Sequence, residues 1–193
     1  MSRATTRESV EVTDETVERI LAYWKARRGY NSHKTYLYFA LLAHTGGRRS
    51  EVLGFFPEDF RELPSGEWVV NFQRQRTAKP KGTPEAYDEK LKTARSYRFV
   101  IIPKELGEET QAYIEAKEIP DGHPIFPNAR RAANYWSDVT KKALGLDPRL
   151  RLHDFEAYYV RKVAPLLLKR LKEKGVDIDN MSPRDFEELF GRS

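Results

Sequence analysis

The first half of this 193-residue chain carries apolar residues at the spacing of amphipathic helices. Val17, Ile20, Leu21 and Trp24 recur at i, i+3, i+4 and i+7, directly after residues that favour the start of a helix. This pattern predicts a helix within residues 12–28.

A second helix is predicted to begin at Ser32, because the apolar residues that follow fall on one face. The pair Gly46 and Gly47 can adopt the left-handed backbone that commonly ends a helix. The sequence therefore predicts a break at these glycines and a third, short helix from Arg49 to about Gly54.

The middle of the chain changes to the alternating pattern of strands. Trp68, Val70 and Phe72 alternate with their neighbours, and residues 97–102 are apolar and β-branched. We predict that these two segments pair as an antiparallel hairpin. The connection between them contains two prolines and a glycine and most of the positive charge, which is typical of a solvated arm.

The remainder of the chain is predicted to be helical. The expected helices cover roughly residues 104–118, 129–144, 154–174 and 183–190. Pro165 should kink or divide the third of them, since proline lacks the backbone N–H that a helix interior needs. The predicted fold class is mixed α+β and mainly helical, with a small antiparallel hairpin packed on a helical core. We expect a flexible leader over residues 1–11 and one domain over 12–193.

The charge of the chain is concentrated in the predicted arm. The chain has 34 Lys and Arg against 29 Asp and Glu, a net charge of +5. Between Arg74 and Arg98 the excess of basic over acidic residues is as large as that of the whole chain. Such a local excess favours a polyanionic partner.

Other chemistry has little support in the composition. The chain has no cysteine, and its four histidines lack metal-ligand spacing, so we expect no metal and no cofactor. No apolar segment resembles a secretion signal or is long enough to span a membrane, so we expect a cytoplasmic protein without a membrane partner.

Residues 44–53, His-Thr-Gly-Gly-Arg-Arg-Ser-Glu-Val-Leu, place an arginine at a glycine-capped break beside a helix start. Such a guanidinium offers forked donors that suit a phosphate. The segment resembles the first signature box of the tyrosine recombinases, the phage integrase family, T-G-x-R-x-S-E. The resemblance implies that Arg48 is the catalytic arginine. The alternative is that Arg48 merely pairs with Glu51 on the surface.

Two further segments resemble the same family in the same order. Residues 91–103 resemble the K-T-x-x-S-x-R run that enters the last strand of the hairpin, which implies that Lys92 is the catalytic lysine. The alternative is an ordinary solvated lysine in a basic loop. Residues 150–160, preceded by a His-Pro-Ile-Phe-Pro link, resemble the box that contains the conserved histidine, here His153. An isolated histidine at a helix start is otherwise a cap or a buried partner.

The chain departs from the family pattern at two positions. Glu156 stands where the second phosphate-binding arginine is expected, and removing one such donor costs on the order of 10²–10³ in rate. Arg192 stands where the family has His or Trp, and the nucleophilic tyrosine would follow beyond the last residue given. We expect the pair Tyr158 and Tyr159 to pack in the core instead.

The resemblance covers about residues 13–193 and lacks the family's N-terminal DNA-clamping domain. It implies a DNA-binding domain of a site-specific tyrosine recombinase, in which intact relatives break and rejoin DNA through a 3′-phosphotyrosyl intermediate. We expect this chain not to cleave. The alternative is a natural noncatalytic regulator on a degenerate integrase scaffold, and an RNA-binding module finds no signature in the chain.

The expected partner is double-stranded DNA, with the chain a monomer in free solution and a tetramer on DNA only if the full-length protein has the family's C-terminal segment. Nine further basic residues are candidates for DNA contact. They are Arg49, Arg74, Arg76, Lys79, Lys81, Lys90, Arg95, Arg98 and Arg151.

Overall fold

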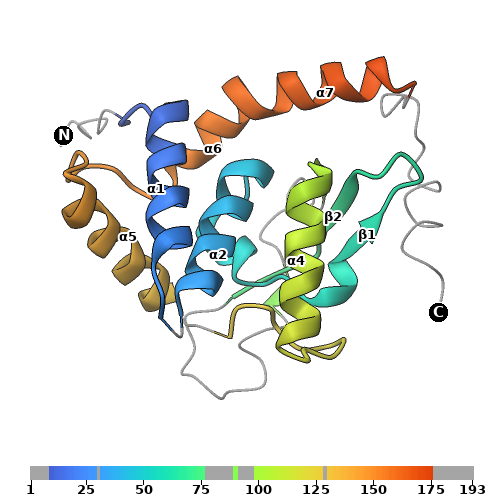
Figure 1. The fold of residues 1–193 in the computed structure, drawn as a ribbon, viewed down its shortest axis with the longest axis horizontal. Coiled ribbons are helices and arrows are strands. Elements are labelled where there is room, and N and C mark those ends of the chain that lie inside the picture. The colour runs from blue at the N-terminus through green and yellow to red at the C-terminus, as the bar shows by residue number, and fades with distance from the viewer. Residues whose placement is uncertain (1–8, 30, 77–88, 91–97, 128–129, 176–193) are drawn as a thin grey trace, which may run out of the picture.

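The computed structural model describes residues 9–29, 31–76, 89–90, 98–127 and 130–175. In these residues, helices surround a small antiparallel sheet (Figure 1). The helices are α1 Asp14–Ala26, α2 Ser32–Thr45, α3 Arg49–Val52, η1 Pro57–Asp59, α4 Lys104–Ala116, α5 Arg130–Leu144, α6 Asp154–Tyr158, η4 Tyr159–Val163 and α7 Ala164–Glu173. The strands are β1 Phe60–Glu62, β2 Trp68–Phe72, β3 Arg74–Gln75, β4 Glu89–Lys90 and β5 Arg98–Ile102. The predicted mixed, mainly helical class is confirmed.

The three N-terminal helices form as predicted. Val17, Ile20 and Trp24 are the buried residues of α1, and the Trp24 Nε1–H donates a hydrogen bond of 2.9 Å to Thr140 of α5. Helix α2 is buried along most of its length, which explains its run of aromatic and aliphatic residues. It lies between α1 and the sheet, at the centre of the molecule (Figure 1).

The predicted hairpin is confirmed as β2 and β5, which pair antiparallel with Trp68 opposite Ile102. The short strand β1, which was not predicted, adds to the other edge of β2 and gives the order β1-β2-β5. Its three residues are too few for a pattern of alternation to show.

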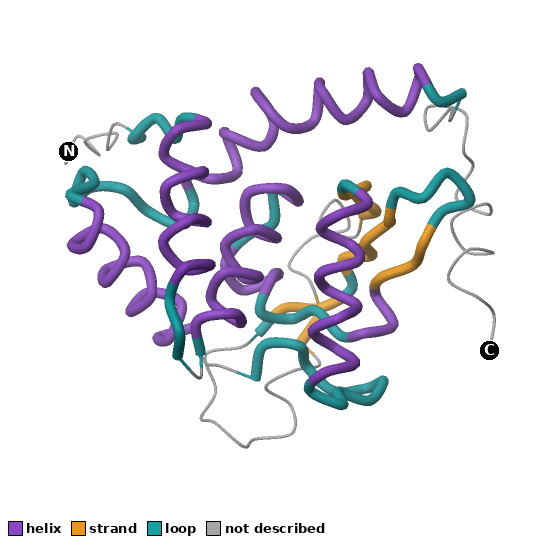
Figure 2. The backbone as a smooth tube through the Cα atoms, viewed as in Figure 1, coloured by secondary structure: helices purple, strands orange, loops and turns teal. Residues whose placement is uncertain are grey.

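The sheet is covered on both faces. Trp68 and Val70 point into the main core, where α4 packs so closely that a Cβ on Gly107 would lie 2.0 Å from the Trp68 Cδ1. Val69 points to the opposite face, where it packs in a second cluster with Leu167 and Leu171 of α7. Figure 2 shows α4 beside the strands and α7 running past the end of the sheet. Alternation along β2 therefore connects α4 to α7 through one strand.

The prediction of a solvated arm between the strands is wrong for its first residues. The strands β3 and β4 pair antiparallel, with Arg74 opposite Lys90. Arg74 forms an ion pair of 2.6 Å with the buried Asp59. Gly54 permits this close approach, because a Cβ there would lie 2.7 Å from the Arg74 carbonyl oxygen. A buried carboxylate distant in sequence thus holds residues that composition alone assigned to solvent.

The predicted helix over 154–174 is divided, as expected, near Pro165. The π-helical turn η4 ends at Val163, two residues before the proline, and α7 continues beyond it. A proline removes one backbone hydrogen bond, and a π turn is one way in which a helix accommodates the change. The helix predicted over 183–190 lies outside the described residues.

We expect Asp59→Ala to lower the free energy of unfolding by about 3 kcal/mol, measured by urea denaturation. Removing one partner of a buried ion pair leaves the other charge uncompensated. The Asp59 carboxylate is buried and also accepts the Phe56 N–H at 2.8 Å.

The matched control is Glu108→Ala, which removes an exposed ion pair with Lys104 on α4. Its expected cost is about 0.3–0.5 kcal/mol. A cost at Asp59 as small as that at Glu108 would contradict the structural role of the buried carboxylate.

Candidate functional site

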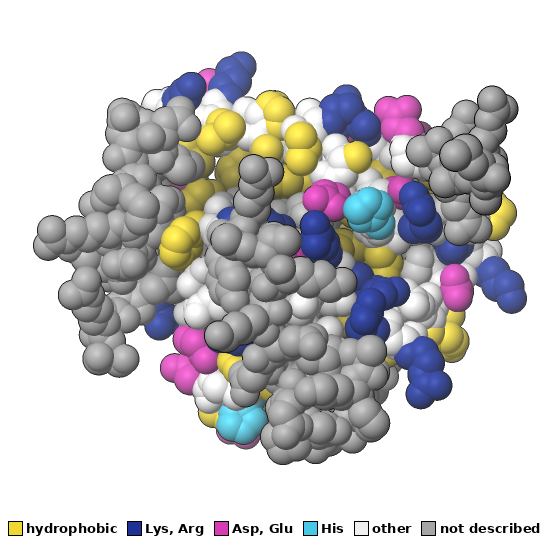
Figure 3. Space-filling model, turned by 180° about the vertical axis from the view of Figure 1, so that it is seen from behind, with side chains coloured by type: hydrophobic (Ala, Val, Ile, Leu, Met, Phe, Trp, Pro, Cys, Tyr) yellow, Lys and Arg dark blue, Asp and Glu magenta, His cyan; other side chains and the backbone are white. Residues whose placement is uncertain are grey.

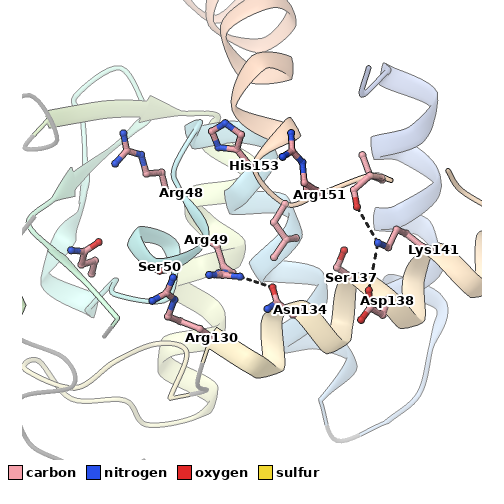
Figure 4. A pocket seen from close by; sticks show the side chains of 13 residues that line it. Arg48, Arg49, Ser50, Arg130, Asn134, Ser137, Asp138, Lys141, Arg151 and His153 are labelled. Carbon is pink, nitrogen blue, oxygen red and sulfur yellow. Dashed lines mark hydrogen bonds and ion pairs between the residues drawn. The ribbon is translucent and has the colours of Figure 1, made fainter. Parts of the chain in front are cut away.

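A cavity of about 530 Å³ opens between α3, α5 and the loop that precedes α6 (Figure 4). Its volume lies within the range of about 300–1,000 Å³ that is typical of ligand sites. It is lined mostly by polar and basic side chains. The lining residues are Arg48, Arg49, Ser50, Gln75, Arg130, Asn134, Ser137, Asp138, Lys141, Leu150, Arg151, Leu152 and His153.

Arg48 is held at the rim of this cavity by the break between α2 and α3. Gly46 ends α2 with a φ of 64°, in the left-handed region, as predicted. A Cβ on Gly46 would also lie 2.4 Å from the Tyr159 Cδ1, so the turn needs glycine for both conformation and space. Arg48 then forms the N-cap of α3 and is exposed.

Glu51 fixes the start of α3 from beneath. Its carboxylate is 2% exposed and accepts the Arg48 backbone N–H at 2.8 Å. Its ion pair is with Arg98 of β5, whose Nη1 lies 3.2 Å from the Glu51 Oε2. The Arg98 guanidinium in turn lies 4.0 Å from the centre of the Phe72 ring. The carboxylate is thus engaged by Arg98, and in the described part of the chain the Arg48 guanidinium has no ion pair.

The opposite rim is formed by the loop before α6. Asp154 is buried and accepts the Arg151 backbone N–H at 2.8 Å, which shapes the turn. Arg151 and His153 line the cavity from this turn, and Figure 4 shows both on the same side of it as Arg48. The structure therefore brings the predicted Arg48 and His153 to one cavity, although 105 residues separate them.

Glu156 lies one helical turn beyond His153 and outside the cavity lining. Its Oε2 is 3.5 Å from the His153 Nδ1, and the Glu156 side chain is 40% exposed. Where the family has a second phosphate-binding arginine, this chain therefore has a carboxylate beside the histidine. The predicted site residues Lys92 and Arg192 lie outside the described residues.

The wall formed by α5 was not predicted. Arg130, Asn134, Ser137 and Lys141 line the cavity from one face of this helix. The spacing i, i+4, i+7, i+11 of these polar residues was the available signal, since it lies opposite the buried residues of α5. Lys141 is occupied by the protein itself, because its Nζ donates to the carbonyl oxygens of residues 148 and 150.

The other predicted DNA contacts divide into three groups. Arg49 and Arg151 line the cavity. Arg74 and Arg98 form ion pairs with buried carboxylates, and Arg76 is 1% exposed. Lys90 lies in β4. Contact with DNA stays a prediction for all of them, and Lys79, Lys81 and Arg95 lie outside the described residues.

The tyrosine pair is integrated into the core, as predicted for at least one of its members. Tyr158 is buried, and its hydroxyl donates a hydrogen bond of 3.0 Å to the Asp14 carboxylate on α1. Burial, and then this hydrogen bond, raise the pKa of Tyr158 to about 12. Burial also raises the pKa of Tyr159, which packs on Gly46. Both hydroxyls are thus poor candidates for an activated nucleophile.

Comparison with known proteins identifies the fold. No family model and no curated protein matches the chain. Solved structures similar to it include the Tn1549 transposon integrase in complex with transposon right end DNA, with a TM-score of 0.59, 19% identity, and coverage of 100% of this chain and 61% of the integrase chain. The XerH site-specific recombinase bound to difH substrate has a TM-score of 0.56 and 17% identity, over 93% of this chain and 49% of XerH.

The XerA recombinase is also similar, with a TM-score of 0.55 and 11% identity over 98% of this chain and 65% of XerA. At these identities the comparison shows a shared fold, that of a tyrosine-recombinase-like catalytic domain, as the sequence resemblance predicted. The chain spans about half to two thirds of the length of these recombinase chains. None of the helices in the described ranges is long and apolar enough to cross a membrane.

We expect Glu51→Ala to lower the free energy of unfolding by about 2–3 kcal/mol, because it leaves Arg98 and the Arg48 N–H without their shared acceptor. Glu51→Gln retains an acceptor oxygen and should cost less. Urea denaturation of both variants measures the difference. If Glu51→Ala were as stable as the parent chain, the carboxylate would not hold this junction together.

Proposed function

We propose that this chain binds duplex DNA by holding a backbone phosphate in the basic cavity. The observation that carries the proposal is the convergence of cationic side chains around a cavity whose lining contains a single carboxylate, Asp138, within the described part of the chain. The cations are Arg48, Arg49, Arg130, Lys141 and Arg151, beside His153.

The arrangement suits a phosphate better than a carboxylate-bearing metabolite or a metal. Guanidinium groups present planar, forked donors that match phosphate oxygens, and they remain charged at any physiological pH. Arg48 and His153 approach from opposite rims, so that one phosphate could accept hydrogen bonds from both. The similar integrase and XerH structures are DNA complexes, and the chain is positively charged overall.

The surroundings of the cavity support a long polyanion. Lys and Arg side chains gather on the face opposite to that seen in Figure 1, where they surround a histidine and a few acidic groups (Figure 3). Contacts between such side chains and backbone phosphates release counterions, so that affinity falls as salt rises. Duplex DNA is the polyanion that this face favours.

We propose further that the chain holds the phosphate without cutting the strand. In the intact family members two arginines neutralise the pentacoordinate phosphate, whereas here Glu156 places a negative charge 3.5 Å from His153. A carboxylate at that position opposes the charge that develops in the transition state. Among the two interpretations of the sequence, this geometry favours a noncatalytic DNA-binding role. The roles of Lys92 as proton donor and of Arg192 at the phosphate remain proposals.

We expect Arg48→Ala to weaken duplex DNA binding by about 10-fold or more at low salt. A charge-assisted hydrogen bond contributes about 1.5–3 kcal/mol. The slope of log K against log salt should become shallower by about 1, because one phosphate contact is lost. Fluorescence anisotropy with a labelled duplex at several salt concentrations measures both quantities.

The control is Lys104→Ala, which removes one positive charge from α4, outside the cavity lining. It should change the salt slope by much less than Arg48→Ala does. DNA binding that is insensitive to salt, or equal losses in the two variants, would refute a phosphate site at Arg48.

We expect Glu156→Gln to tighten DNA binding by about 2- to 5-fold at low salt. The substitution removes a half-exposed negative charge near the cavity, a change on the order of 0.2–1 kcal/mol. Rising ionic strength should reduce this gain, because salt screens exposed charges. Anisotropy titrations of the two proteins give the ratio of affinities.

The control for this charge change is Glu108→Gln on α4, which should leave the affinity unchanged within error. Weaker binding by Glu156→Gln would contradict the proposed repulsion. A detergent-resistant covalent adduct between the unaltered chain and a nicked suicide duplex would refute the proposed lack of cleavage.

A further inference from the structure

Two arginines face each other at the end of the cavity that is farther from His153. Arg49 extends from the first turn of α3 and Arg130 from the first residue of α5, and both side chains reach into the same space (Figure 4). Arg48, Arg151 and His153 form a separate group along the other rim. The cavity therefore has two groups of cations, and the proposed phosphate at Arg48 uses only one.

The pair lacks a neutralising partner among the described residues. The Arg49 Nη1 donates to the Asn134 Oδ1 at 2.7 Å, which orients the guanidinium without neutralising it. Arg130 forms no ion pair with any other described residue. The Nε atoms of both arginines are buried without a hydrogen-bond partner in the described structure. Two like charges with unused buried donors raise the energy of the empty site, and an anion between them would lower it.

The position of Arg49 is fixed from two sides. The hydroxyl of the buried Tyr38 donates to the Arg49 carbonyl oxygen at 3.5 Å, and Asn134 holds the side chain. Burial, and then the charge of Arg130, lower the pKa of Arg49. This direction agrees with a cation held close to a second cation in a partly desolvated site. Such a preorganised pair reduces the entropic cost of ligand binding.

The cavity has room for more than one phosphate group. Its volume of about 530 Å³ is many times the roughly 30 Å³ that one water molecule takes up in the liquid. The two groups of arginines open into this single space, so that a continuous strand could pass from one to the other. We propose that Arg49 and Arg130 form a second phosphate subsite, which holds a neighbouring phosphate of the same DNA strand that contacts Arg48.

This inference rests on the proposed DNA binding, and salt dependence tests the two separately. Arg130→Gln should make the slope of log K against log salt shallower by about 1, as Arg48→Ala does. The double variant should be shallower by about 2, because the two arginines neutralise different phosphates. Fluorescence anisotropy with one labelled duplex, at salt concentrations from low to physiological, measures all three slopes.

The matched control is Arg131→Gln, which removes the same charge from the next residue of α5, exposed and outside the cavity lining. Its slope should stay close to that of the parent chain. Arg130→Lys retains the charge and should retain the slope, while the loss of the forked donors lowers the affinity.

Each other outcome has a distinct meaning. A double variant whose slope equals that of the single variants would show one shared phosphate and overturn the second subsite. A normal slope for Arg130→Gln, with a shallower slope for Arg48→Ala, would also overturn the subsite but leave the proposed function intact. If neither variant changes the slope, the proposed function itself fails.

A stability measurement separates binding from a structural role. Because Arg130→Gln relieves repulsion in the empty protein, its midpoint of urea denaturation should equal or exceed that of the parent chain. A clearly lower midpoint would show that Arg130 supports the fold and would overturn its assignment as a ligand-binding residue.

Discussion

The buried carboxylate of Glu51 lies where the helical part of the molecule meets the hairpin. It accepts the Arg48 N–H from the turn after α2 and forms an ion pair with Arg98 on β5. Removing a carboxylate from water costs free energy, and these two partners offset that cost only in one relative position of helix and strand. The rim of the cavity therefore depends on the hairpin being in place, although the hairpin contributes no catalytic chemistry at this point.

The same device is repeated around the cavity, and it explains why some arginines remain available. Asp59 and Asp154 are buried and hold Arg74 and Arg151, respectively, through short contacts. Carboxylates that would neutralise the cavity are placed beneath its walls instead. Arg48, at the rim, is left facing the open space. A surface that attracts phosphate is thus obtained from a chain in which acidic residues nearly balance basic ones.

Periodicity predicted the helices and the hairpin because burial repeats along each element. It could not predict β1, which has three residues, or the pairing of β3 with β4, whose residues are polar. The π turn before Pro165 gave no signal of its own beyond the proline. In the site, the motif around Arg48 and that around His153 were recognisable because local turns position both residues.

The sequence by itself determined the fold class, the glycine-capped break that presents Arg48, and the carboxylate at position 156 where an arginine was expected. These features depend on neighbours close along the chain or on residue identity alone. Only the tertiary structure decided which basic residues face the cavity. Glu51 and Arg98 are 47 residues apart, and Arg49 and Asn134 are 85 apart. Whether an arginine binds a buried carboxylate or remains open to a ligand depends on such distant partners, which no local pattern of residues records.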